Sequence, residues 1–338
     1  MNLLSTDLRS SLRICTLIVL ALLSACSAAP LRIEPDNLVW PLPPNPPRIK
    51  YIQSIYSEDD IGRVYSFKEQ LFGKEYLDSI VRPYGVSAGR GKIYMTDLTM
   101  RGIMVFDLHA RRTSILGIER SLEVPSSVVA DAQGRVFVAD PGGGKVSVYD
   151  EHGAYRTAYL IEGTKPLGLA ISGSLGRLYV ADGAQHRVVV LDLDGKQLFA
   201  FGGLGEEEGK FNLPLALAVG GDGHVYVLDS RNFRVQIFDA DGKFLSKFGS
   251  VGDQTGMFAN PKAIAVDSEG HIYVTDAAYN NFQVFDSQGH FLIFVGTLGQ
   301  APGQFYLPGG IALDENDRIY VADQLNRRIQ VFQYMKDQ

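Results

Sequence analysis

Cysteine is almost absent from this chain of 338 residues. The two cysteines, Cys15 and Cys26, both lie near the start, and the rest of the chain has none. A folded body without cysteine cannot hold a disulfide framework, a thiolate metal site or a cysteine nucleophile. Its stability must come from an apolar core, for which a hydrophobic content of 46% is sufficient.

An excess of basic residues is also lacking. The formal net charge is −6 at pH 7, from 32 Lys and Arg against 38 Asp and Glu. Proteins that bind nucleic acid usually carry a basic footprint, so we expect no nucleic-acid partner, although a local basic patch is compatible with this balance. Glycine is abundant, with 36 residues, which suits a fold with many tight turns.

The apolar segment near the start is too short to span a bilayer. Ile14–Leu23 has ten residues and follows Arg9 and Arg13, as in a secretory signal. The next residues, Leu23-Ser24-Ala25-Cys26, resemble a bacterial lipobox. This resemblance implies a lipoprotein signal peptide at 1–25, lipidation of Cys26, and a lipid-anchored protein of the bacterial cell envelope at the periplasmic face of the outer membrane. The alternative is an ordinary signal followed by a chance cysteine.

Residues 26–47 are rich in proline, which favours extended polyproline II structure. We expect a tether that holds the body away from the membrane. Its tryptophan, Trp40, would either pack the tether onto the body or contact the bilayer interface. Residues 48–56 are rich in β-branched and aromatic residues and predict a strand, and the 57–81 insertion predicts one short helix near 66–80.

A repeat dominates the remaining chain. Six strand motifs of the type Ile-Tyr-Val-Thr-Asp end in aspartate, 43, 42, 47, 47 and 47 residues apart: Asp97, Asp140, Asp182, Asp229, Asp276 and Asp323. A proline precedes the first strand of each unit: Pro83, Pro125, Pro166, Pro214, Pro261 and Pro308. Four-stranded units of this length bury their faces by stacking radially.

We therefore predict an all-β protein, a six-bladed β-propeller of four-stranded antiparallel blades over residues 48–338. The expected blades span about 82–123, 124–164, 165–212, 213–259, 260–306, and 307–335 with 48–56. The sixth unit has no fourth strand of its own. The strand at 48–56 would supply it and close the ring, which also covers an exposed edge.

Two stretches carry a family resemblance: Asp229-Ser230-Arg231-Asn232-Phe233-Arg234-Val235-Gln236-Ile237-Phe238 and Asp323-Gln324-Leu325-Asn326-Arg327-Arg328-Ile329-Gln330-Val331-Phe332. Their Asp…Asn…Arg-(Ile/Val)-Gln-(Val/Ile)-Phe pattern resembles NHL-repeat six-bladed β-propellers, and the resemblance covers residues 82–335. That family includes ligand binders, RNA binders and enzymes, so the pattern does not specify function. Gly102 and Lys145 replace the arginine in the first two units.

The long loops are expected on one face of the ring, where the 2–3 loops and the connections between blades meet. That face collects these possible binding residues: Arg101, Lys145, His186, Arg187, Arg231, Asn232, Arg234, Tyr279, Asn280, Asn281, Asn326, Arg327 and Arg328. One interpretation is a locally basic rim for an anionic or carbohydrate-like ligand. The other is that the repeated basic residues pair with the six aspartates and brace the blades.

A catalytic metal needs about three converging protein ligands. The starts of the first strands, which would line the channel, offer none: Tyr84-Gly85, Ser126-Ser127, Leu167-Gly168, Leu215-Ala216, Lys262-Ala263 and Gly309-Gly310. We therefore expect no cofactor, no metal and no catalytic residues. The favoured function is a monomeric, membrane-anchored, non-enzymatic propeller that binds a protein, a polysaccharide or another extended polymer on its long-loop face. The alternative is a metal-dependent lyase or lactonase-like enzyme.

Overall fold

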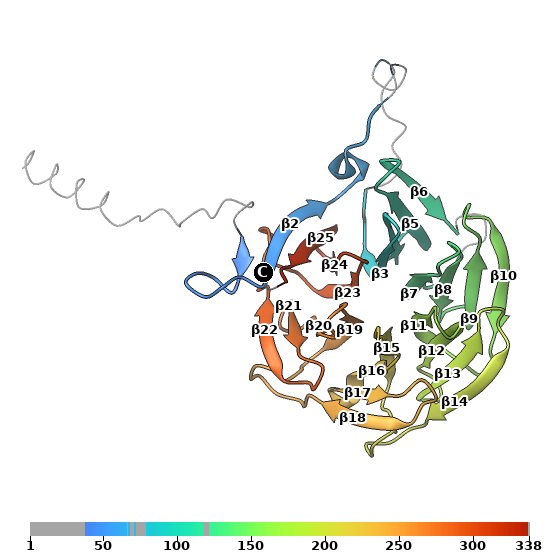
Figure 1. The fold of residues 1–338 in the computed structure, drawn as a ribbon. Helices are drawn as coiled ribbons and strands as arrows, with labels where there is room; N and C mark the ends of the chain where they lie inside the picture. Colours follow the sequence, from blue (N-terminus) through green and yellow to red (C-terminus); the bar gives the residue numbers. More distant parts are fainter. Residues whose placement is uncertain (1–37, 66, 68–70, 72–78, 118–121, 337–338) are drawn as a thin grey trace, which may run out of the picture. The chain divides into compact units, whose positions relative to one another are not determined.

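The computed structural model describes residues 38–65, 67, 71, 79–117 and 122–336. Within them, six antiparallel sheets follow one another around a central channel (Figure 1). The predicted six-bladed β-propeller is confirmed. Among the described residues, no helix is long and apolar enough to cross a membrane.

Each blade is a meander of consecutive strands running from the channel outward. Blade 1 contains β3 (Pro83–Gly89), β4 (Lys92–Asp97), β5 (Gly102–Asp107) and β6 (Arg112–Leu116). Blade 2 contains β7 (Ser127–Ala130), β8 (Val136–Asp140), β9 (Lys145–Tyr149) and β10 (Tyr155–Leu160). Blade 3 contains β11 (Pro166–Ser172), β12 (Arg177–Asp182), β13 (Arg187–Asp192) and β14 (Gln197–Gly202).

The other three blades follow the same plan. Blade 4 contains β15 (Pro214–Val219), β16 (Val225–Asp229), the short helix η4 (Ser230–Asn232), β17 (Arg234–Phe238) and β18 (Phe244–Phe248). Blade 5 contains β19 (Pro261–Val266), β20 (Ile272–Asp276), β21 (Asn281–Phe285) and β22 (Phe291–Val295). Blade 6 contains β23 (Pro308–Leu313), β24 (Arg318–Asp323), β25 (Arg328–Tyr334), β2 (Ile49–Ile55) and β1 (Val39–Trp40).

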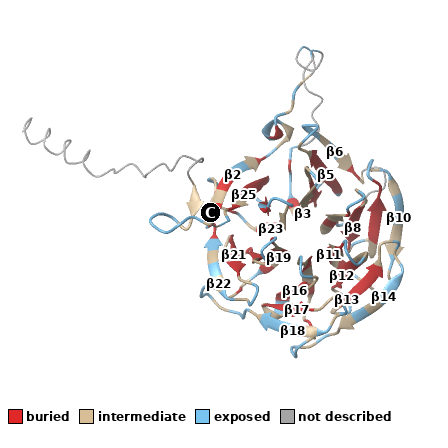
Figure 2. Ribbon diagram, viewed as in Figure 1, coloured by how far each residue is buried: buried red, intermediate tan, exposed pale blue. Residues whose placement is uncertain are grey.

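Burial explains why the second and third strands are almost wholly apolar. β16 and β20 are buried at every residue, since each lies between two strands of its own sheet and between two neighbouring sheets. The outer strands, such as β18, are mostly exposed. Figure 2 shows buried middle strands and exposed outer ones around the ring. The apolar core is therefore a set of clusters between blades.

The last blade joins distant parts of the chain. β2 pairs antiparallel with β25, from Ile49 opposite Tyr334 to Ile55 opposite Ile329. β1 adds a fifth strand, because Trp40 pairs with Ile49 and packs edge-on against Phe332, with ring centroids 5.7 Å apart. Val39 and Trp40, which the sequence assigns to the tether, thus form part of blade 6.

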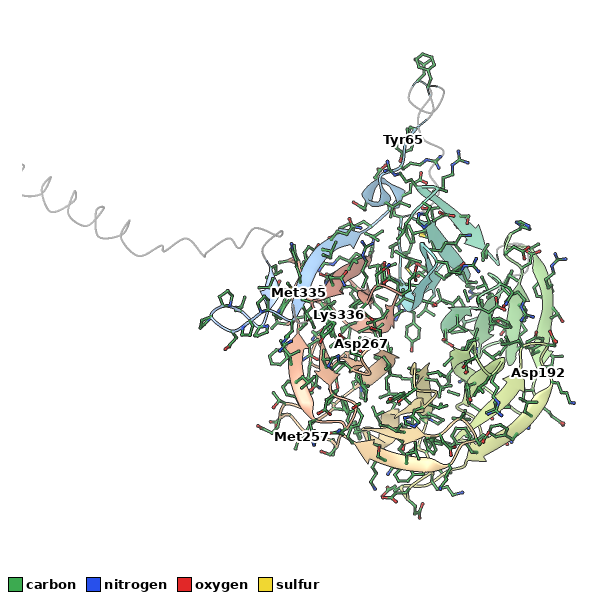
Figure 3. The ribbon with its side chains drawn as sticks, viewed as in Figure 1. Tyr65, Asp192, Met257, Asp267, Met335 and Lys336 are labelled. Carbon is green, nitrogen blue, oxygen red and sulfur yellow. The ribbon has the colours of Figure 1, made fainter. Side chains whose placement is uncertain are left out.

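The C-terminal end ties blade 6 to blade 5 on the face of the short turns. The Lys336 ammonium lies 2.9 Å from the Asp317 carboxylate and donates to Ser268 Oγ at 2.9 Å. Figure 3 labels Lys336 beside Met335 and Asp267. Ser268 in turn donates its backbone N–H and its hydroxyl to Asp317. These bonds lie on the face opposite the long loops.

The connection from β2 to β3 begins with a short 3-10 helix, η2 (Glu58–Ile61). Ile61 packs with Ile55 and Ile80, and η2 contacts β2 and β6 at the outer rim. Most of the helix predicted near 66–80 lies outside the described residues. Of its described residues, Phe67 and Leu71 are helical and exposed.

Small residues on the innermost strands let the six blades converge. A Cβ on Gly85 would lie 2.6 Å from the Ser126 carbonyl oxygen, and one on Gly168 would lie 2.6 Å from the Leu215 carbonyl oxygen. Any larger residue would force neighbouring inner strands apart. The predicted first-strand residues do line the channel.

Candidate ligand-binding face

The six repeated aspartates are fully buried at the inner edge of the long-loop face. Each carboxylate accepts backbone N–H groups from the connection that precedes its own blade. Asp97, for example, accepts from Val81 at 3.0 Å and from Arg82 at 2.8 Å. Asp323 accepts from the Tyr306 N–H at 2.8 Å. The aspartates therefore fix the loops of this face and are not available to a ligand.

Two predicted binding residues, Arg234 and Arg328, are buried and belong to the scaffold. The Arg234 guanidinium bonds Asp229 at 2.8 Å and the carbonyl oxygens of Glu206, Glu207 and Lys210. These bonds commit the guanidinium to the folded chain, so Arg234 acts here as a structural residue. Arg328 makes the equivalent bonds to these groups: the Asp323 carboxylate, the Ala301 and Gln304 carbonyl oxygens, and the Tyr56 hydroxyl.

Burial raises the pKa of both aspartates that these arginines contact, Asp229 and Asp323, against the opposing effect of their hydrogen bonds. The carboxylates are thus costly to keep charged, and the guanidinium bonds offset part of that cost.

Loop asparagines and one tyrosine are also committed to internal bonds. Asn232 and Asn326 donate to the carbonyl oxygens of Gly205 and Gly299. Tyr279 donates its hydroxyl to the Gly252 carbonyl. These three predicted residues hold the long connections in place.

The residue four after each aspartate has a left-handed backbone. The φ angles are 53° for Arg101, 53° for His186, 53° for Asn280 and 54° for Arg327. His186 Nδ1 accepts the Leu213 N–H at 2.9 Å, and Asn280 Oδ1 accepts the Leu307 N–H at 3.0 Å. His186 and Asn280 therefore serve as turn residues that also link one blade to the next.

The arginine position varies among the other blades. Arg187 bonds Asp182 at 3.2 Å but keeps its guanidinium partly exposed, because the short connection 161–165 brings no carbonyls onto it. Lys145 is half-buried near the glycine loop of blade 2. Asn281 is buried, and its Oδ1 has no hydrogen-bond partner among the described residues.

A smaller set of cations remains exposed on this face. None of their side chains forms an ion pair or hydrogen bond with another described residue. We call this set the free cations: Arg82, Arg101, Lys165, Arg231 and Arg327. Sequence analysis identified three of them and missed Arg82 and Lys165, although both directly precede the proline of a first strand, which was the available signal. In the acidic connection 203–213, Glu208 faces outward and pairs with Lys247 of β18 at 3.3 Å.

The channel at the centre of the face contains a cavity of about 220 Å³. Leu167 and Leu215 contribute apolar surface, and Lys262 contributes the one charged side chain among the described residues that line it. Burial lowers the pKa of the Lys262 ammonium below its usual range, with the Asp276 carboxylate acting in the opposite direction. No cluster of histidine, cysteine, aspartate or glutamate that could hold a metal ion occurs in the described part of the chain. The channel residues therefore do not fit the metal that lyase-like and lactonase-like propellers imply.

The fold and these loops define a β-propeller whose blades are held together by buried carboxylates. Family models agree: the NHL repeat model matches residues 164–191 and 211–238, and a 6-bladed beta-propeller model matches residues 268–336. The protein is a six-bladed β-propeller with NHL repeats.

Solved structures of similar fold have diverse functions. A virginiamycin B lyase from Staphylococcus aureus is 13% identical with a TM-score of 0.57, over 76% of this chain and 97% of that one. A gluconolactonase from Xanthomonas campestris is 17% identical with a TM-score of 0.59, over 76% and 88%. A chain of a nidogen/laminin complex is 17% identical with a TM-score of 0.56, over 74% and 88%. At these identities the similarity establishes the fold alone.

Proposed function

We propose that this protein is a membrane-anchored, non-enzymatic propeller that binds an anionic polymer or an acidic protein segment on its long-loop face. The observation that carries the proposal is the set of free cations. They are exposed positive charges on a protein with a net charge of −6. Each can attract a negatively charged group of a partner, which the acidic residues elsewhere on the surface repel.

The free cations are suited to binding because their exposed side chains form no ion pair or hydrogen bond with another described residue. Arg234 and Arg328 show what a structural arginine does in this protein: both are buried and saturated with internal bonds. Arg231 and Arg327 lie within three residues of them, yet both are exposed. Exposed guanidinium groups can form bidentate bonds with sulfate, phosphate or carboxylate groups.

Replacing Arg101, Arg231 and Arg327 together with glutamine is expected to weaken binding to dextran sulfate by at least about tenfold, about 1.4 kcal/mol. The wild-type affinity should also fall as salt is raised, since exposed charges are screened. Affinity can be measured by titration with labelled polymer, using neutral dextran as the uncharged comparison.

The matched control replaces three exposed cations in the turns of the opposite face with glutamine: Arg111, Lys196 and Lys243. This variant has the same net charge as the first. Equal weakening by both variants would mean that only net charge matters and would contradict a binding face.

Membrane anchoring rests on Cys26 and its lipobox-like context. Cys26→Ala is expected to move the protein from the membrane fraction to the soluble fraction, because acyl chains contribute about 0.8 kcal/mol for each buried methylene. Fractionation with immunodetection measures this. Cys15→Ala is the control and should leave the distribution unchanged. A Cys26→Ala protein that stays in the membrane would refute lipidation as the anchor.

The lyase or lactonase-like alternative is supported by fold similarity alone. It would require metal ligands that the described channel lining does not offer. A stoichiometric divalent ion held in the channel of the purified protein would contradict the non-enzymatic part of the proposal.

A further inference from the structure

The channel is distinct from the rim, because it lies at the centre of the ring and carries one charged side chain among the described residues that line it. Lys262 follows Pro261 at the start of β19 and lines the cavity. Its ammonium makes no hydrogen bond or ion pair with any described residue. Lys262 is partly buried, and a charge that is withdrawn even in part from water is costly to maintain unless something compensates it.

The neighbouring carboxylate, Asp276, supplies only part of that compensation. Asp276 accepts the backbone N–H groups of Ala259 and Asn260 through Oδ2, and those of Ala278 and Tyr279 through Oδ1. It is committed to fixing the loops, as its counterparts are in the other blades. The Lys262 ammonium therefore lacks an anionic partner of its own.

The other polar groups of the channel are mostly satisfied. Ser126 Oγ donates to the Leu167 carbonyl at 2.7 Å, and Ser127 Oγ accepts the Leu169 N–H at 3.1 Å. Burial raises the pKa of Tyr84, so its hydroxyl stays protonated at neutral pH and remains a possible donor. Lys262 is thus the one charged donor among the described lining residues, and the Tyr84 hydroxyl is a neutral donor on the same lining.

The cavity has room for a small molecule. Its volume of about 220 Å³ corresponds to about seven water molecules at about 30 Å³ each. Leu167 and Leu215 would contact an apolar group, and small ligand sites commonly combine an apolar lining with a few fixed polar groups.

We propose that the channel binds a small carboxylate with an apolar body, with its carboxylate on the Lys262 ammonium. The carboxylate would supply the missing counter-charge, and the Tyr84 hydroxyl would donate to a carboxylate that reaches it. This site goes beyond the proposed function, since it lies inside the ring and takes a small molecule rather than a polymer.

Benzoate is a suitable probe, with benzamide as its uncharged counterpart of nearly the same shape. We expect wild-type protein to bind benzoate at least tenfold more tightly than benzamide in an NMR titration or by calorimetry. Lys262→Met, which keeps an apolar side chain of similar length, should lose that preference. The matched control is Lys165→Met, an exposed lysine on the same face that does not line the cavity, and it should bind benzoate as the wild type does.

Equal affinity of the wild type for benzoate and benzamide would overturn the proposal. Unchanged benzoate binding by Lys262→Met would also overturn it. So would a loss of benzoate binding in Lys165→Met as large as the loss in Lys262→Met. A second substitution, Lys262→Gln, and thermal melting of each variant exclude loss through unfolding. The triple variant of Arg101, Arg231 and Arg327 should keep benzoate binding while losing dextran sulfate. Benzoate binding therefore tests the channel site, and dextran sulfate binding tests the polymer-binding face, so that either proposal can fail without the other.

Discussion

Removal of residues 38–56 is expected to lower the free energy of unfolding by at least about 5 kcal/mol and to open the ring. The segment contains β1 and β2, and its side chains Ile49, Tyr51 and Ile55 are buried. Each buried apolar side chain contributes about 1.5–3 kcal/mol, and β25 would also lose its hydrogen-bonded neighbour. A protein of this kind is stable by only about 5–15 kcal/mol. Chemical denaturation measures the change.

A matched pair of substitutions on β2 tests the same closure without deleting backbone. Ile55 is 0% exposed and Ile52 is 41% exposed, and both lie on this strand. Ile55→Asp should destabilise strongly, since it buries a charge without a partner, whereas Ile52→Asp should change stability by less than about 0.5 kcal/mol. Equal stability of the two variants, or an unchanged melting temperature after the deletion, would contradict this closure.

Arg328→Met is expected to cost about 3–5 kcal/mol, because removal of one member of a buried ion pair leaves the other charge uncompensated. Arg328 is 1% exposed on its side chain and lies 2.8 Å from the fully buried Asp323. The substitution also removes the donors that the Ala301 and Gln304 carbonyls use. Urea denaturation of the variant measures the loss.

The adjacent Arg327 provides the control, since it is exposed and bonds no described side chain. Arg327→Met should change stability by less than about 0.5 kcal/mol. The double variant Arg328→Met with Asp323→Asn should be less destabilised than the sum of its single variants, because the uncompensated charge is gone. The prediction would be contradicted if the double variant lost as much stability as the two single variants together. It would also be contradicted if Arg328→Met alone changed the free energy of unfolding only slightly.

Much of the fold could be predicted from the sequence, because the position of each strand in a propeller is determined by the residues of that strand and its turns. The buried β20, Ile272–Asp276, and its counterparts repeat the same residue types at the same distance from an aspartate. The segment at 38–47 could not be predicted in this way. Its prolines suggest a spacer. Trp40, however, packs against Phe332, which lies far away in the sequence. No local pattern encodes that contact.

The candidate site was predicted only in part, because the same residue type has different roles on one face. Arg231 and Arg234 lie three positions apart, yet the first is free and the second is saturated. Lys165 was missed because it lies outside the repeated loop motif. Lys262 was noted at the channel, but its isolation depends on where the Asp276 hydrogen bonds go.

The sequence by itself determined the six blades, their order and the six buried aspartates, since periodic burial and turn chemistry are local properties of the chain. Only the tertiary structure decided which cations are free. Arg187, Arg234 and Arg328 occupy the same position in their repeats. Carbonyl oxygens of the long connections accept hydrogen bonds from Arg234 and Arg328. The short connection beside Arg187 provides no such acceptor. Whether a charge is buried and compensated depends on neighbouring segments, and those meet only when the ring closes.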